Sequence, residues 1–183
     1  MRLRYLYQTL DDRSNPEEIE NNGPYKCNRK NAWLGCGYYF WDSNLEAAHW
    51  WGKDYKDGYV ICRSQYDYDS LDYLDLVGNT EHLDSFKLIA NEIANKIKKS
   101  PTVPMVIEQL KILTNFSKLY KAIRAHPINS KNNEEDKIFF IDTHTAYINL
   151  NPPIQMCVLN KSFLIKNIFD IIYPEIYCKE SLV

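Results

Sequence analysis

Several features that mark common protein classes are missing from this chain of 183 residues. Its five cysteines are widely spaced, with no C-x-x-C pair and no histidine at a zinc-ligand interval, so no metal site is expected. The longest apolar runs, such as 138–141, are much shorter than a membrane-spanning helix requires. Because no signal peptide is recognisable, we expect a protein of a reducing cytoplasm, either bacterial or that of a cell into which it is delivered.

The chain also lacks a strong charge of either sign. Its 22 Lys and Arg residues and 24 Asp and Glu residues give a net charge of −2 at pH 7. Electrostatic binding of nucleic acid needs clustered cations that displace counterions, so constitutive binding of this kind is not expected. The length fits one sizeable hydrophobic core and is short for two. We therefore expect a single domain over residues 1–183.

Motifs of the common nucleotide-binding and hydrolytic enzymes are absent as well. The sequence has no P-loop, no G-x-S-x-G and no H-E-x-x-H. Gly35-Cys36-Gly37 has two glycines but lacks the third and leads into a strand, which argues against a Rossmann-type fold. Tyrosine, in contrast, occurs fourteen times, and aromatic rings that carry polar groups are useful in cores and clefts alike.

Hydrophobic periodicity and capping signals predict a mixed arrangement of strands and helices. The expected strands cover residues 3–9, 33–41, 59–63, 73–77, 137–148 and 154–159. The expected helices cover about 16–22, 44–51, 83–97, 106–119 and 162–172, and Ser43 and Glu46 form a capping box for the second of them. Strands at both ends, with a helical insertion over about 81–121, predict an α+β fold and not alternating βαβ units.

The most informative stretch is residues 34–52, LGCGYYFWDSNLEAAHWWG. It resembles the signature of the ADP-ribosyltransferase superfamily, in which a glycine-led aromatic strand is followed by a helix with small residues and an aromatic. Here Gly37 opens the strand match, and residues 47–50 match the helix. In poly(ADP-ribose) polymerase-like domains two rings at this separation sandwich the nicotinamide of NAD⁺. The resemblance implies that Tyr39 and Trp50 do so here.

The two ends of the chain carry weaker matches, in the order of the family. Residues 4–9, RYLYQT, look like its opening strand, which implies that Gln8 binds the adenosine-side ribose and that the backbone of Thr9 holds the carboxamide. Residues 153–158, PIQMCV, look like its closing strand, where most toxins have a catalytic Glu and this chain has Gln155. Bacterial branches with Gln at that position look particularly similar. The implied fold is a split β-sheet core with NAD⁺ in the cleft between two short sheets.

The chemistry of such a site is consistent with these residue types. Nicotinamide in NAD⁺ is a flat cation, which the face of an aromatic ring attracts by about 0.5–2 kcal/mol. Cleavage of its glycosidic bond builds positive charge on the ribose, which a dry aromatic slot with few polar groups suits. Gln155 can hydrogen-bond but carries no charge, so polymer elongation is not expected, whereas mono-ADP-ribosyl transfer stays feasible. The expected catalytic residues are Gln155 and Tyr39.

Three hypotheses follow. The leading one is an NAD-dependent mono-ADP-ribosyltransferase-like protein, a bacterial or phage toxin or defence effector with an unknown acceptor and an antitoxin or other protein partner. The alternative is an inactive module of the same kind that binds NAD, ADP-ribose or a protein. The third is an unrelated α+β protein whose tyrosines merely pack. Structural roles are expected for His49, His126 and His144, and Arg124 fits an ion pair with an acidic loop better than a pyrophosphate.

Overall fold

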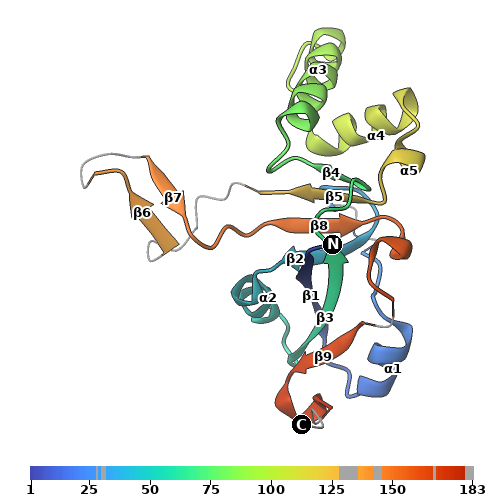
Figure 1. Ribbon diagram of the computed structural model, residues 1–183, viewed down its shortest axis with the longest axis vertical. Helices are drawn as coiled ribbons and strands as arrows, with labels where there is room; N and C mark the ends of the chain where they lie inside the picture. Colours follow the sequence, from blue (N-terminus) through green and yellow to red (C-terminus); the bar gives the residue numbers. More distant parts are fainter. Residues whose placement is uncertain (28, 30–31, 128–135, 142–145, 167, 180–183) are drawn as a thin grey trace.

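The computed structural model describes residues 1–27, 29, 32–127, 136–141, 146–166 and 168–179 (Figure 1). Its strands are β1 (Leu3–Asp11), β2 (Tyr38–Asp42), β3 (Tyr59–Asp67), β4 (Tyr73–Asp75), β5 (Ala122–Ala125), β6 (Lys137–Phe139), β7 (Tyr147–Asn149), β8 (Gln155–Val158) and β9 (Asp170–Tyr173). Its helices are α1 (Pro16–Asn22), α2 (Leu45–Gly52), α3 (Thr80–Ile97), α4 (Val103–Leu113) and α5 (Phe116–Leu119), with 3-10 turns η2 (Lys161–Phe163) and η3 (Glu175–Tyr177). The predicted α+β class is confirmed.

Seven of the described strands form one sheet in the order β4-β5-β8-β2-β1-β3-β9. Its neighbours are antiparallel apart from β4 and β5, which are parallel. Helices α3, α4 and α5 lie beyond the β4 end of the sheet, and α2 lies against β1 (Figure 1). Strands β6 and β7 pair separately, as a hairpin that projects from the body (Figure 1). None of the helices in the described part is long and apolar enough to cross a membrane.

The sheet is weakly joined where β1 meets β2. The described residues of these strands pair at Leu6 with Asp42 and at Tyr7 with Trp41, whereas β1 and β3 pair over nine residues and β2 and β8 over four. The β1–β2 ladder therefore ends after Tyr7, although both strands continue. The two short sheets expected from the resemblance are thus one sheet, in which this short ladder lies between β4, β5, β8 and β2 on one side and β1, β3 and β9 on the other.

Alternate residues of β2 pack on opposite faces of the sheet, as strand geometry requires. Tyr39 packs on the face that α4 covers, in a core that includes Ile107 and Ile123. Phe40 packs on the other face, with Leu6 and Tyr66. Both faces of β2 are therefore covered, and the strand is held in a single register.

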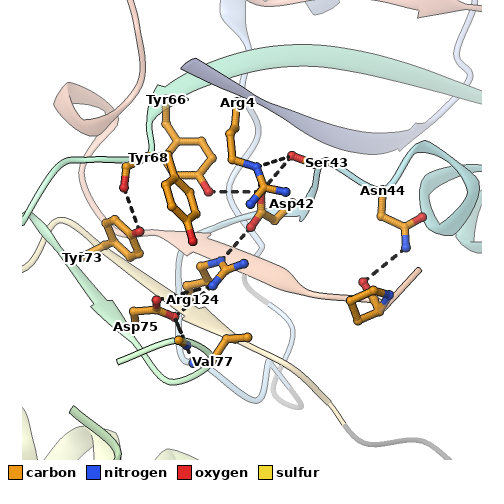
Figure 2. Close-up of polar contacts among 12 residues, drawn as sticks. Arg4, Asp42, Ser43, Asn44, Tyr66, Tyr68, Tyr73, Asp75, Val77 and Arg124 are labelled. Carbon is orange, nitrogen blue, oxygen red and sulfur yellow. Dashed lines mark hydrogen bonds and ion pairs between the residues drawn. The ribbon is translucent and has the colours of Figure 1, made fainter. Parts of the chain in front are cut away.

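A buried ion-pair network lies where β2, β4 and β5 come together (Figure 2). Arg124 Nε is 2.7 Å from Asp42 Oδ2, and its Nη1 is 3.1 Å from Asp75 Oδ1. Tyr66 donates its hydroxyl hydrogen to Asp42 Oδ1 at 3.1 Å. Burial alone would lower the pKa of Arg124, but the hydrogen bond and charge of Asp42 and the charge of Asp75 outweigh it and raise that pKa. An ion pair was expected for Arg124 and is present, but its partners belong to the strands β2 and β4 and not to an acidic loop.

The predicted helix over 162–172 is wrong. The chain forms the short turn η2 there and then enters β9, which pairs with β3 through Asp170–Arg63 and Ile171–Cys62. The apolar residues that suggested a helix instead face two different cores, with Phe163 in one and Ile171 in another. Local spacing did not indicate β9, because its ladder partner is far away in the sequence.

Other boundaries differ for local reasons. The helix predicted over 106–119 is broken at Thr114, whose backbone is extended, so that α4 and α5 are separate. The strand predicted over 33–41 begins only at Tyr38, and the strand predicted over 137–148 is two strands, β6 and β7. The N-cap of α2 is Asn44 and not Ser43, since Asn44 Oδ1 accepts a hydrogen bond from Ala47 N at 2.7 Å.

Candidate functional site

A cavity of about 980 Å³ opens where the β1–β2 ladder ends. Its walls come from β1, the segment before β2, β2 itself, α2 and the chain that flanks the hairpin. Small-molecule sites in proteins are typically about 300–1,000 Å³, so the cavity could enclose a ligand as large as a dinucleotide. A ligand-sized space therefore lies beside the short β1–β2 ladder.

The cavity brings together five of the six residues predicted for the site. Gln8, Thr9, Tyr39, Trp50 and Gln155, which belong to β1, β2, α2 and β8, all line it. These residues come from the beginning, the first third and the end of the chain. Their convergence on one cavity is a three-dimensional finding that sequence spacing alone does not require.

Gly37, the sixth predicted residue, is not among the residues that line the cavity. It lies against β8, where a Cβ atom would come within 2.5 Å of Cys157 Sγ and 2.8 Å of the carbonyl oxygen of Val158. Cys27 N also donates to the Gly37 carbonyl at 2.8 Å. Glycine is therefore needed here because β8 approaches too closely to leave room for a side chain.

Tyr39 lies at the cavity wall, and its hydroxyl group is bound to the turn before β2. It accepts a hydrogen bond from Leu34 N at 2.8 Å and donates one to the Gly35 carbonyl at 2.9 Å. Burial raises the pKa of Tyr39, and the neighbouring Cys157 raises it further, so the phenol stays protonated. Its hydroxyl holds the turn in place, and its ring is the part of the side chain left for a ligand.

Trp50 is the exposed ring of the predicted pair, with 54% of its surface accessible. Its ring centroid lies 6.2 Å from that of Trp51, which in turn lies 6.2 Å from that of Trp41. Trp33, Trp41 and Trp51 also line the cavity, and the sequence interpretation did not assign them to it. Trp41 could have been found, because it alternates with Tyr39 along β2 and therefore faces the same side.

Gln8 is buried, and its side-chain amide is hydrogen-bonded to main-chain groups. Its Nε2 donates to the carbonyl oxygens of Tyr25 at 2.8 Å and Tyr39 at 3.3 Å, and its Oε1 accepts from Tyr25 N at 2.8 Å. The amide therefore bridges β1 and β2 where their ladder has ended. A ribose contact would have to use the remaining lone pair of Oε1 or displace one of these bonds.

Thr9 is tied to the neighbouring helix in a similar way. Its hydroxyl donates to the Ala48 carbonyl at 2.8 Å, and its backbone pairs with Ile61 of β3. The hydroxyl is therefore used in positioning α2 against β1. The predicted role of Thr9 concerned its backbone, and that role stays a prediction.

Gln155 is the first residue of β8 and is held from both sides, by Trp41 of β2 and Ala125 of β5. Its Oε1 accepts a hydrogen bond from Trp33 Nε1 at 2.8 Å.

The start of α2 is also bonded to the cavity wall. Glu46 Oε2 accepts a hydrogen bond from Asn151 Nδ2 at 2.6 Å, and Asn44 donates one to the Asn151 carbonyl at 3.3 Å. These contacts connect α2 to the chain that leads into β8.

Charged groups of both signs line the cavity. Arg13 lies 3.2 Å from Asp11, in an ion pair that is exposed to solvent. Lys26 and Arg29 form no ion pair with any described residue, and the Arg29 guanidinium lies 5.9 Å from the Trp51 ring. These two cations are therefore available to an anionic ligand.

The histidines contribute little to this cavity. His49 Nδ1 lies 3.0 Å from the Tyr59 hydroxyl, and its ring packs edge-on against Tyr173. His126 precedes the lining residue Pro127, and burial lowers its pKa. His144 lies outside the described residues.

The described part of the chain has no group of three or more His, Cys, Asp or Glu residues that could hold a metal ion.

Comparison with known proteins gives no relative: no family model, no curated protein and no solved structure matches this chain.

Proposed function

We propose that the cavity binds NAD⁺ and that the protein is a mono-ADP-ribosyltransferase-like enzyme. The observation that carries the proposal is the convergence of Thr9, Tyr39, Trp50 and Gln155 on one cavity at the β1–β2 junction. These residues belong to the three segments whose sequences resemble that superfamily. An unrelated protein whose tyrosines merely pack would have no reason to gather them around one space.

The chemistry of the cavity wall supports this ligand class. NAD⁺ combines a flat cationic ring with two phosphates, and the wall combines indole rings with Lys26 and Arg29, which have no acidic partner among the described residues. Indole faces attract the pyridinium ring, and the two cations can offset the pyrophosphate charge. In this proposal Tyr39 and Trp50 contact the nicotinamide, Gln155 its ribose, and Gln8 holds the wall open for the adenosine side.

The proposed reaction breaks the bond between ribose C1′ and nicotinamide N1, and the electron pair leaves with nicotinamide. An acceptor nucleophile then forms a bond to C1′ and loses its proton. Because Gln155 is neutral, the site lacks a carboxylate at that position to stabilise positive charge on the ribose. Rate enhancement would then rest on orientation of NAD⁺ and exclusion of water by the aromatic walls. The acceptor and any toxin or antitoxin pairing are part of the proposal.

Incubation with NAD⁺ labelled in the nicotinamide ring tests the proposal, with released nicotinamide measured by chromatography. Trp50→Ala is the first variant, because the ring is exposed and its loss should leave the fold intact. We expect it to weaken NAD⁺ binding by about 3- to 30-fold, the value of one ring–cation contact. Ile112→Ala on α4, where the side chain is 76% exposed, is the matched surface control and should change nothing.

A second candidate function is a module that binds NAD⁺ or ADP-ribose without cleaving it, and the neutral amide of Gln155 favours it. Melting temperature and nicotinamide release, measured on the same protein samples, distinguish the enzyme from the binding module. Thermal stabilisation by NAD⁺ that saturates, without release of nicotinamide, supports the binding module, because a ligand stabilises the state that binds it. If neither NAD⁺ nor ADP-ribose raises the melting temperature and no nicotinamide is released from NAD⁺, both functions are excluded.

A further inference from the structure

The hydrogen bond between Trp33 and Gln155 fixes the orientation of an amide in the cavity wall. An indole N–H can only donate, so the atom that faces Trp33 Nε1 at 2.8 Å must be the amide oxygen of Gln155. The NH₂ group of the same amide therefore occupies the other position. Gln155 and Trp33 both line the cavity.

Trp33 lies in a turn that is held by backbone hydrogen bonds and by the hydroxyl of Tyr39. The turn that carries it is closed by hydrogen bonds from Ala32 N to the Arg29 carbonyl and from Gly35 N to the Ala32 carbonyl, both 3.0 Å. The hydroxyl of Tyr39 holds the next two residues of this turn. On the opposite side, β2 and β5 hold the backbone of Gln155. Both partners of the bond are thus fixed by the fold.

The NH₂ group of Gln155, in contrast, makes no hydrogen bond to any described residue. A half-buried donor at the wall of a cavity is satisfied by water or by a ligand atom that carries a lone pair. Its matching ligand group is a hydroxyl, carbonyl or phosphate oxygen. A group that can only donate does not fit there.

We propose that Trp33 is a positioning residue that holds Gln155 with its NH₂ group toward the bound ligand, so that this part of the cavity donates a hydrogen bond to a ligand oxygen. The identity of that oxygen rests on the proposed function, under which it is a hydroxyl of the nicotinamide-side ribose. Donation to this hydroxyl withdraws electron density from the sugar and opposes the positive charge of the cleavage transition state. The native pair therefore contributes to the binding and orientation of NAD⁺ and not to stabilisation of the charge in the cleavage transition state.

The first test replaces the hydrogen-bond donor at position 155 by an acceptor. In Gln155→Glu the carboxylate still accepts the Trp33 N–H, but its second oxygen now accepts a hydrogen bond from the ribose hydroxyl. We expect nicotinamide release to rise about 10-fold or more, within the range of a single transition-state hydrogen bond. In this step the C1′–N1 bond breaks, water adds at C1′, and one proton is released. A rate equal to or below that of the native protein contradicts the proposal.

A double-mutant cycle separates positioning from packing. Trp33→Phe keeps an aromatic ring, although a smaller one, and removes the N–H, and should weaken NAD⁺ binding by about three- to tenfold. In a Gln155→Met background the same change should have a clearly smaller effect, because the indole N–H then has no amide oxygen to hold and only the smaller ring area remains different. Trp50→Phe is the comparison, and its effect should be the same in both backgrounds. Equal effects of Trp33→Phe in both backgrounds would mean that Trp33 acts by packing.

The ligand-free protein gives a test that does not depend on NAD⁺. In ¹⁵N-labelled protein, the Trp33 indole N–H should exchange with solvent at least about tenfold faster in Gln155→Met than in the native chain, since its acceptor is gone. Unchanged exchange overturns the positioning role itself. If exchange rises but no variant binds NAD⁺, the positioning role stands and the proposed function fails.

Discussion

Asp42 is a buried carboxylate that contributes to the stability of the fold through several contacts. Its side chain is fully inaccessible, and it pairs with Arg124 at 2.7 Å while it accepts a hydrogen bond from Tyr66. Removing the charge of Asp42 leaves the buried Arg124 with Asp75, 3.1 Å away, so the cost is that of one lost charge-assisted pair, about 2–3 kcal/mol, and not that of an unpartnered buried charge. We expect Asp42→Asn to lower the free energy of unfolding by that amount, measured by urea denaturation.

The matched control for Asp42→Asn is Glu108→Gln, the same change of carboxylate to amide in an exposed ion pair. Glu108 lies 2.7 Å from Lys111, but 63% of its side chain is accessible. Solvent screens such a pair, so the expected cost is about 0–1 kcal/mol. Equal costs for the two variants would contradict the role given to burial.

We expect His126 to make the free energy of unfolding depend on pH. Its Nε2 atom is buried and has no hydrogen-bond partner among the described residues, and burial lowers its pKa below the ordinary 6.5. As the pH falls through 6.5, the unfolded chain takes up the proton before the folded chain does. The free energy of unfolding must therefore decrease over this range, and the decrease ends once the folded protein is also protonated.

The variant His126→Gln isolates this effect, because it removes the titrating group. Urea denaturation of the native chain at about pH 7.5, 6.5 and 5.5 should show a stability that falls with pH, and the fall should be smaller in the variant. Carboxylates titrate at lower pH and affect both proteins alike. Parallel curves for the two proteins would rule out His126 as the source.

Among the secondary-structure elements, α2 packs against β1 and also lines the cavity. Its N-cap Asn44 accepts from Ala47 N and also donates to the carbonyl oxygens of Asn151 at 3.3 Å and Pro152 at 3.4 Å. We expect Asn44→Ala to lower stability by about 1–2 kcal/mol, measured by thermal denaturation. Thr102→Ala is the control, since Thr102 caps α4 without a side-chain cap bond and should cost clearly less.

Elements with strong local signals were predictable from the sequence. Pro16 and Gly23 set the ends of α1, and the apolar spacing of α3 placed it within a few residues. Elements defined by distant partners were not predictable. Strand β9 owes its conformation to a ladder with β3, and the sequence around Ile171 reads equally well as a helix. An extended conformation that is stabilised only by pairing leaves no local signal.

The residues of the candidate site likewise differ in how far the sequence could predict them. The segment around Tyr39 and Trp50 could be recognised because its pattern is continuous in the sequence. Trp33 could not, because its contact with Gln155 spans 122 residues and depends on the turn before β2. Gln8 was assigned to a ligand on the basis of its position, whereas the structure uses its amide in the β1–β2 junction. Sequence thus indicated which segments meet, and the structure shows how their polar groups are used.

For the molecule as a whole, the junction between the two parts of the sheet depends on Gln8. Gln8→Leu would leave the N–H and carbonyl of Tyr25 and the carbonyl of Tyr39 without their partner, and we expect a loss of about 2–5 kcal/mol in the free energy of unfolding. Gln65→Leu on β3, a half-exposed position, is the matched control and should stay within about 1 kcal/mol of the native value. Urea denaturation measures both, and calorimetry measures their NAD⁺ affinity. A Gln8→Leu variant that keeps native stability but loses NAD⁺ binding would show that Gln8 serves the ligand and not the junction.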